Sequence, residues 1–129
     1  MSERNLVDMK VMVLGRDSMA RRLVTSLSGC GMDVVSATDP AGAVPLLAGD
    51  QFDLVVVDDH MLEAFAACRD GSESWNTPVV LSMANTGTNW GLAMSLGVDG
   101  HIHDGMGHAE VCARLNSVVR RRGSGSCDL

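Results

Sequence analysis

The chain has 129 residues, of which 46% are hydrophobic, and it carries a net charge of −6. A chain of this length forms one domain and buries a core without help from disulfides or metals. The acidic balance argues against nucleic acid or an anionic membrane as the main partner, and an aromatic content of 3% argues against stacking on single-stranded nucleic acid. Lys10 is the only lysine, so a mechanism that needs another one is excluded.

Four cysteines are spread along the chain, with no Cys-x-x-Cys pair: Cys30, Cys68, Cys112 and Cys127. This spacing, without a recognisable signal peptide, favours free thiols in a reducing compartment. No apolar run approaches the ~18 residues of a membrane span. We therefore expect a cytoplasmic domain at residues 10–122, preceded by an N-terminal extension at 1–9. Residues 123–129 are expected to form a flexible Gly/Ser tail or a truncated linker.

Short β-branched runs alternate with amphipathic stretches, which is the pattern of a parallel sheet covered by helices. In chain order, the expected elements are a strand at 10–14, a helix at 18–28, a strand at 32–36, a helix from 40, a strand at 51–57, a helix at 63–69, a strand at 78–82, a helix at 89–96, a strand at 100–103 and a helix at 108–121. The run at 51–57 is expected to be the central strand.

Caps and breakers support several of these boundaries. Ser18 is a suitable N-cap for the first helix, and Asp39 with Pro40 supplies an N-cap and a first helical residue for the second. Pro45 lies early inside that second helix and should strain or shorten it. Three arginines at 120–122 complement the dipole at the C-terminal end of the last helix, where we expect a solvated helix end.

Ligands of an open α/β sheet bind beyond the carboxyl ends of its strands. The residues that the sequence brings to this edge are Gly15, Arg16, Asp17, Asp58, Asp59, Ser82, Met83, His103 and Asp104. An apolar strand that ends in a carboxylate, as the central strand does at Asp58, is a common way to present an acid at the mouth of such a site.

Four stretches resemble the receiver domain of bacterial two-component response regulators: Arg21–Leu23, Phe52–Asp58, Thr77–Leu81 and Leu96–Gly100. The resemblance covers about residues 10–122. It implies a flavodoxin-like α/β fold, in which a five-stranded parallel sheet of order 2-1-3-4-5 is covered by five helices. It also implies that Asp58 stands at the position of the phospho-accepting aspartate.

The rest of the family's active set is changed. Gly15 and Arg16 stand where receivers carry the pair of acids that binds Mg²⁺, and Asp104 stands where they carry a lysine. Met83 replaces the hydroxyl residue at the end of the fourth strand. Ser82 lies one residue earlier, so its side chain should point to the opposite face of the sheet.

These changes bear on phosphoryl transfer, which needs cations to offset charge on the equatorial oxygens. Arg16 could take the space of Mg²⁺ and pair with Asp58 or Asp104, or it could point to solvent, as surface arginines commonly do. We expect no cofactor and no metal, with Asp17 and Asp58 as the weak candidates for metal ligands.

The resemblance then implies an atypical receiver, a non-enzymatic signalling module that works without the usual Mg²⁺-dependent phosphorylation. The alternative is a phosphorylation-competent receiver, in which Asp58 accepts the phosphoryl group with non-standard cation support and Mg²⁺ returns as a cofactor. Implied partners are proteins: a histidine kinase, another regulator or an output domain. The implied output face is formed by the fourth helix, the fifth strand and the fifth helix, and it includes Trp90, His101 and His103. The same face could also form a homodimer.

Two weaker patterns indicate other ligands. His101 and His103 share one side of the predicted fifth strand close to His108, so a His-x-His metal pair completed by Cys112 or Asp104 is geometrically feasible. No second metal motif accompanies it. A nucleotide could also bind at the glycine turn after the first strand, although an aspartate stands where the dinucleotide motif needs its second glycine.

Overall fold

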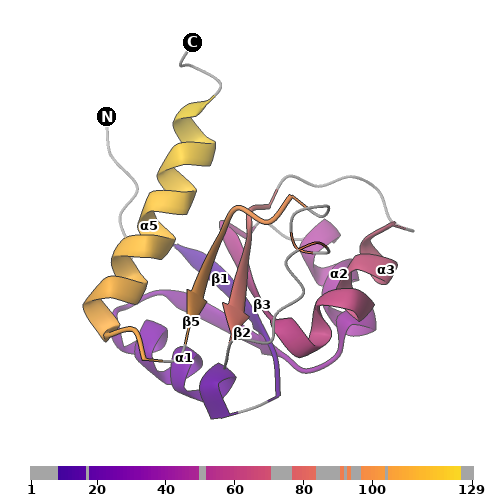
Figure 1. Cartoon of the computed structure of the whole chain (residues 1–129), viewed down its shortest axis with the longest axis horizontal. Helices are drawn as coiled ribbons and strands as arrows, with labels where there is room; N and C mark the ends of the chain where they lie inside the picture. Colours follow the sequence, from indigo (N-terminus) through magenta and orange to yellow (C-terminus); the bar gives the residue numbers. More distant parts are fainter. Residues whose placement is uncertain are drawn as a thin grey trace.

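The computed structural model describes residues 9–16, 18–49, 52–70, 77–83, 91, 93, 97–103 and 105–125. Its centre is a five-stranded parallel sheet in the order β2-β1-β3-β4-β5, with α1 and α5 on one face and α2 and α3 on the other (Figure 1). The predicted strand order is confirmed, and β3 is the central strand. Within the described part of the chain, no helix is both long and apolar enough to cross a bilayer.

In chain order, the described elements are β1 (Lys10–Leu14), α1 (Ser18–Gly29), β2 (Asp33–Ala37), α2 (Pro40–Gly49), β3 (Leu54–Asp58), the 3-10 turn η2 (Asp59–Met61), α3 (Leu62–Asp70), β4 (Val79–Met83), β5 (Gly100–His103) and α5 (His108–Gly125). The first and fifth strands have their predicted bounds. The second and fourth lie one residue later than predicted, and β3 begins at Leu54 and includes Asp58.

The helices differ from prediction at two places. Helix α5 extends to Gly125, so residues 123–125 of the predicted tail are helical. Most of the helix expected at 89–96 lies outside the described residues; Gly91 and Ala93 are described and both are helical. The structure therefore describes four α-helices where five were expected.

Of the two effects expected of Pro45, strain or shortening of α2, the shortening does not occur, because the helix continues past Pro45 to its end at Gly49. A proline inside a helix removes one backbone hydrogen bond, and the side chain of Pro45 is exposed. Val44 and Leu47, on either side of it, are buried in the core. The predicted N-cap is confirmed: Asp39 Oδ1 accepts a hydrogen bond from the backbone N–H of Ala41 at 3.3 Å.

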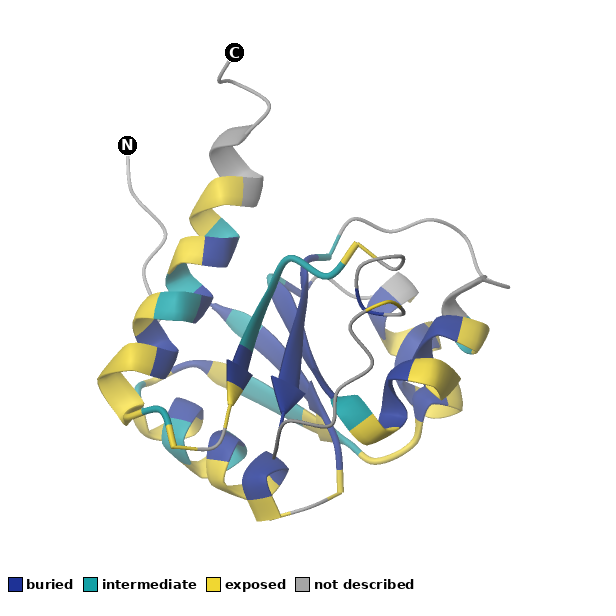
Figure 2. Cartoon of the chain, viewed as in Figure 1, coloured by how far each residue is buried: buried dark blue, intermediate teal, exposed yellow. Residues whose placement is uncertain are grey.

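Two apolar layers enclose the sheet, and β3 and β4 are buried along their whole length (Figure 2). The strand residues that face α1 and α5 are Val11, Val13, Leu54, Val56, Val80 and Ile102. Those that face α2 and α3 are Met12, Leu14, Val55, Val57, Val79, Leu81 and Met83. This alternation follows the two-residue period of a strand, so the face that each strand-end residue occupies is determined by its register.

Lys10 lies at the amino end of β1, far from the carboxyl edge of the sheet. In the parallel pairing of β1 with β3, Leu14 stands opposite Val57, so Lys10 is about five residues below the level of Asp58, or roughly 16 Å at ~3.3 Å per residue. Its Nζ lies 4.9 Å from the centroid of the Phe52 ring, in a cation–π contact. The chain's single lysine is therefore held away from Asp58.

Candidate functional site

Asp58 ends the central strand and is buried, with 6% of its surface exposed. One carboxylate oxygen, Oδ1, accepts a hydrogen bond from the backbone N–H of His60 at 3.1 Å. This bond caps the 3-10 turn η2 in the manner of an N-cap aspartate. The turn exists because the strand ends in an acid that can bond two residues ahead, and it brings the next side chains back towards the sheet edge.

This turn brings His60 to Asp58. His60 was not among the predicted site residues. Its Nδ1 lies 3.3 Å from Asp58 Oδ1 and 3.5 Å from Asp59 Oδ1, and most of its ring is exposed. The three ligand atoms of this group lie within 4.8 Å of one another. The signal in the sequence was the spacing: a histidine two residues after a strand-ending aspartate falls within reach of its carboxylate.

Gly15 packs its backbone directly against Asp58. A Cβ added to Gly15 would lie 2.9 Å from the Ala20 Cβ, 3.1 Å from the Asp58 Cβ and 3.4 Å from Asp58 Oδ2. Real Cβ atoms essentially never approach another atom within 3.0 Å. This position therefore has no room for the acidic side chain that receivers carry there. The backbone N–H of Gly15 donates to the Ala37 carbonyl at 3.0 Å.

Arg16 is exposed, and its Nε donates a hydrogen bond to the backbone carbonyl of Thr38 at 2.9 Å. This bond directs the guanidinium towards the segment that follows β2, so the described contact matches the alternative in which Arg16 lies at the surface. Asp17 and Asp104 lie outside the described residues, and a pair between Arg16 and Asp104 stays a prediction.

Ser82 and Met83 point to opposite faces of the sheet, as the strand period predicted. Ser82 is buried level with Asp58 in the register of β3 and β4. Its hydroxyl donates to the sulfur of Met19 in α1 at 3.4 Å. Met83 is buried among the residues that face α2 and α3. At the position where receivers carry a hydroxyl residue, this chain therefore has Met83, whose side chain packs in the core.

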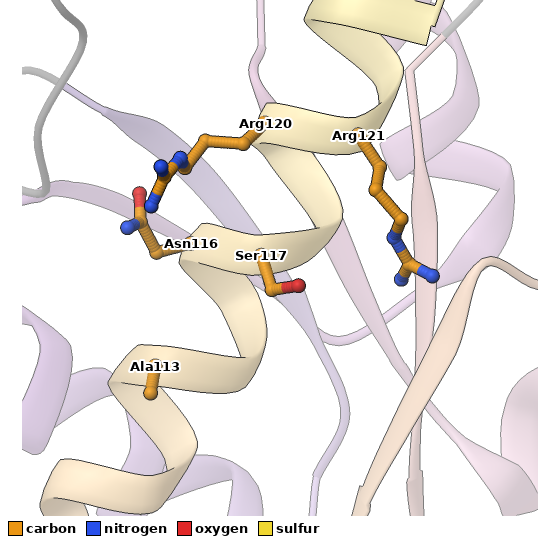
Figure 3. Close-up of a pocket in the computed structure, with 5 residues that line it drawn as sticks. All are labelled: Ala113, Asn116, Ser117, Arg120 and Arg121. Atoms are coloured by element: carbon orange, nitrogen blue, oxygen red, sulfur yellow. The ribbon is translucent and has the colours of Figure 1, made fainter.

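Two of the three residues predicted for an output face, His101 and His103, are described and lie on β5. His101 is half-buried, His103 is exposed, and Trp90 lies outside the described residues. On the outer side of α5 the chain forms an open depression of about 430 Å³, lined by Ala113, Asn116, Ser117, Arg120 and Arg121 (Figure 3). Its two arginines point to different sides of the helix, and Arg121 donates to the Asp99 carbonyl at 3.4 Å. This surface carries positive charge on an acidic chain.

The described side chains at the carboxyl edge do not fit Mg²⁺, the ion that receivers bind there. Mg²⁺ requires a near-octahedral set of oxygen ligands, but Gly15 supplies no side chain and Arg16 supplies no oxygen ligand. His60 Nδ1 lies against both Asp58 and Asp59, and an imidazole nitrogen suits transition metals better than Mg²⁺.

Solved structures with this fold include response regulators. The chain superposes on full-length FixJ from B. japonicum with a TM-score of 0.71 and 20% identity, covering 92% of this chain and 61% of that one. It superposes on the receiver domain of the TMAO respiratory system response regulator TorR with a TM-score of 0.71 and 16% identity, covering 88% and 98%. It superposes on the chemotaxis response regulator CheY4 of Vibrio cholerae with a TM-score of 0.69 and 21% identity, covering 85% of this chain and 98% of that one. The flavodoxin-like receiver fold implied by the sequence resemblance is confirmed.

At the level of sequence, the chain is similar to a probable transcriptional regulator, ycf27, from Porphyridium aerugineum. The two are 29% identical over 116 residues, which is 87% of this chain and 48% of the relative. The chain thus spans about half the length of the curated relative that it matches. No protein-family model matches the chain.

Proposed function

We propose that this chain is an atypical receiver domain of two-component signalling, a non-enzymatic module that binds other proteins without Mg²⁺-dependent phosphorylation of Asp58. The fold that it shares with response regulators supports the signalling role. The observation that carries the proposal is the close approach of Gly15 to Asp58: a Cβ added to Gly15 would lie only 3.1 Å from the Asp58 Cβ. It removes the position from which receivers hold Mg²⁺ beside the phospho-acceptor.

The charges near Asp58 support the same proposal. In phosphoryl transfer, catalysis depends on positioning and on cations that stabilise the transferred group. Lys10 lies at the other end of the sheet, and Arg16 is hydrogen-bonded to Thr38. Asp58 instead caps the turn η2 through the backbone of His60, which is a structural task that an unmodified carboxylate performs.

One observation favours the alternative of a phosphorylation-competent receiver. His60 Nδ1 lies 3.3 Å from Asp58 Oδ1 on an exposed ring, so a protonated His60 could supply part of the cation support that the described edge otherwise lacks. In that case modification of Asp58 would depend on His60.

Labelling with an acyl phosphate separates these two functions. The chain is incubated with acetyl phosphate with and without MgCl₂, and intact mass is measured alongside the variants Asp58→Asn and His60→Ala. We expect no phosphoryl adduct on the wild type under any of these conditions. A Mg²⁺-dependent adduct that disappears in Asp58→Asn contradicts the proposal. An adduct that forms without MgCl₂ and is lost in both Asp58→Asn and His60→Ala establishes the alternative.

For partners, we propose a protein: a histidine kinase, another regulator or an output domain. The surface around β5 and α5 is the candidate, because it combines exposed polar residues with the arginines of the α5 depression. The same face is the candidate for a homodimer. We also propose a cytoplasmic location, and the net charge of −6 argues against direct contact with nucleic acid or an anionic membrane.

A further inference from the structure

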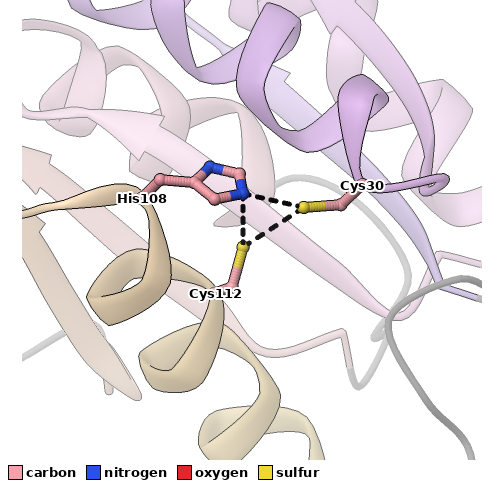
Figure 4. A group of neighbouring side chains, drawn as sticks. All are labelled: Cys30, His108 and Cys112. Carbon is pink, nitrogen blue, oxygen red and sulfur yellow. Dashed lines mark hydrogen bonds between the residues drawn. The ribbon is translucent and has the colours of Figure 1, made fainter.

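Three metal-ligating side chains meet between the end of α1 and the start of α5: Cys30, His108 and Cys112 (Figure 4). Cys30 Sγ lies 3.0 Å from His108 Nε2 and 3.6 Å from Cys112 Sγ, and Cys112 Sγ lies 3.8 Å from His108 Nε2. This cluster lies apart from Asp58 and plays no part in the proposed signalling function.

Local structure holds each ligand in place. His108 and Cys112 are one turn apart on α5, so their side chains share a face of the helix. Cys30 directly follows α1, where its N–H donates to the Leu27 carbonyl at 3.1 Å and Gly31 ends the helix with a φ of 92°. The two arms of the cluster therefore rest on ordered backbone at both helix ends.

Two of the three separations lie close to those of a tetrahedral zinc site, and the third is shorter. With Zn–S bonds of about 2.3 Å and Zn–N bonds of about 2.0–2.1 Å, two sulfur ligands lie about 3.8 Å apart and a sulfur–nitrogen pair about 3.6 Å apart. The observed sulfur–sulfur separation is 3.6 Å, and the sulfur–nitrogen separations of 3.0 and 3.8 Å lie on either side of the ideal value. To bind the ion, Cys30 Sγ and His108 Nε2 must move apart by about 0.6 Å, and the other two separations must change by about 0.2 Å each.

We propose that Cys30, His108 and Cys112 form a zinc site in which water takes the fourth position. Thiolate and imidazole form the soft ligand set that selects zinc over Mg²⁺ or Ca²⁺. Cys112 is buried while Cys30 is half-buried and His108 is exposed, so the ion has a route in from solvent on one side.

A further contact orients the histidine. Ser26 Oγ in α1 is hydrogen-bonded to Nδ1 of His108. In a metal site of this kind, Nδ1–H donates to an outer partner and leaves the lone pair of Nε2 free for the metal. Here Nε2 is the atom that faces both sulfurs, so Ser26 is a positioning residue for the zinc ligand.

Binding exchanges protons for the ion. Burial, with a hydrogen bond and charge interaction from Cys30, raises the pKa of the Cys112 thiol to about 11. Without a metal the Cys112 thiol is therefore protonated, and it lies within hydrogen-bonding distance of Cys30. Zn²⁺ replaces their protons, which pass to the buffer, and the two thiolates with neutral His108 leave a site of zero net charge.

Metal titration of the full chain tests the site. The fully reduced, metal-free protein is titrated with Co²⁺ as a spectroscopic probe and then with Zn²⁺ in competition with a chromophoric chelator. We expect one equivalent of tetrahedral, thiolate-bound Co²⁺ that one equivalent of Zn²⁺ displaces. Cys30→Ser and His108→Gln should weaken zinc binding by at least about 100-fold, and Ser26→Ala by about 10–100-fold, as for outer partners of other zinc ligands.

The matched control is Cys68→Ser, which removes a half-buried cysteine of α3 that packs on the opposite face of the sheet. It should bind zinc as the wild type does. Because His108 is exposed, its variant is expected to fold, and circular dichroism of each variant verifies this. Failure of the reduced wild type to bind one equivalent, or equal affinity in Cys68→Ser and the ligand variants, overturns the proposal.

Discussion

Replacing Gly15 by alanine tests whether the packing of β1 against Asp58 excludes a side chain at this position. The new Cβ would lie 2.9 Å from the Ala20 Cβ and 3.1 Å from the Asp58 Cβ, whereas two carbons at optimal separation lie about 3.5–4.0 Å apart. Overpacking of this kind typically costs about 1–3 kcal/mol. We therefore expect the variant to be less stable than the wild type.

An opposing term reduces this loss. The φ of Gly15 is not positive, so alanine fits the backbone there and gains about 0.4–1 kcal/mol by restricting the unfolded chain. The net loss is about 1–2 kcal/mol, which for a chain of 129 residues lowers Tm by roughly 4–8 °C. Urea unfolding gives the free energy directly, and a thermal scan gives the shift in Tm.

Two further variants isolate the steric cause. Ala20→Gly removes the nearer contact, so the losses in the double variant Gly15→Ala/Ala20→Gly should fall short of additivity by at least ~0.5 kcal/mol. Gly42→Ala is the control, since a Cβ there meets nothing within 4 Å, and it should not destabilise. If Gly15→Ala is as stable as the wild type and the double variant is additive, the steric reasoning is refuted, and with it the exclusion of an acid at this edge.

Three other variants follow from contacts described above. Asp58→Ala removes the cap of η2 and should lower the unfolding free energy by about 0.5–2 kcal/mol. His60→Ala keeps the backbone donor and should change the unfolding free energy by less than ~0.5 kcal/mol. Equal losses for the two variants in chemical denaturation would contradict the capping role. In metal-free reducing buffer, stability should fall as pH rises from 9 towards 11, because Cys112, with its pKa raised to about 11, loses its proton first in the unfolded chain. The loss is on the order of 2 kcal/mol, and Cys112→Ala should flatten this dependence. Pro45→Ala should raise Tm, because it restores a helix hydrogen bond and removes the steric clash of the ring, which together cost up to ~3 kcal/mol in a helix interior. A lower Tm would show that the proline fits α2 without cost.

The strands were predictable because each short apolar run has a local boundary. Lys10–Leu14 is bounded by a charged residue and a glycine, and its limits were confirmed. The opposite faces of Ser82 and Met83 followed from the strand period alone. The continuation of α2 past Pro45 could not be predicted, because the core contacts of its neighbours Val44 and Leu47 depend on tertiary packing.

The contacts around Asp58 and at the end of α1 were less accessible to sequence reasoning. Nothing local shows that Arg16 bonds to Thr38, because a long side chain can reach several acceptors and tertiary packing selects among them. His108 and Cys112 were considered as ligands from their place near the fifth strand. Their third partner, Cys30, lies 78 residues before His108 and is brought there only by the packing of α1 beside α5.

The cation–π contact at the amino end of β1 has a practical consequence. Because Lys10 is the only lysine, an amine-reactive dye or surface linker has a single side chain to modify, beside the terminal amine. That side chain lies at the Phe52 end of the sheet, roughly 16 Å below Asp58 along the strand direction. Protein immobilised through it would present its carboxyl edge to solution, so binding of a partner there can be measured without blocking the site.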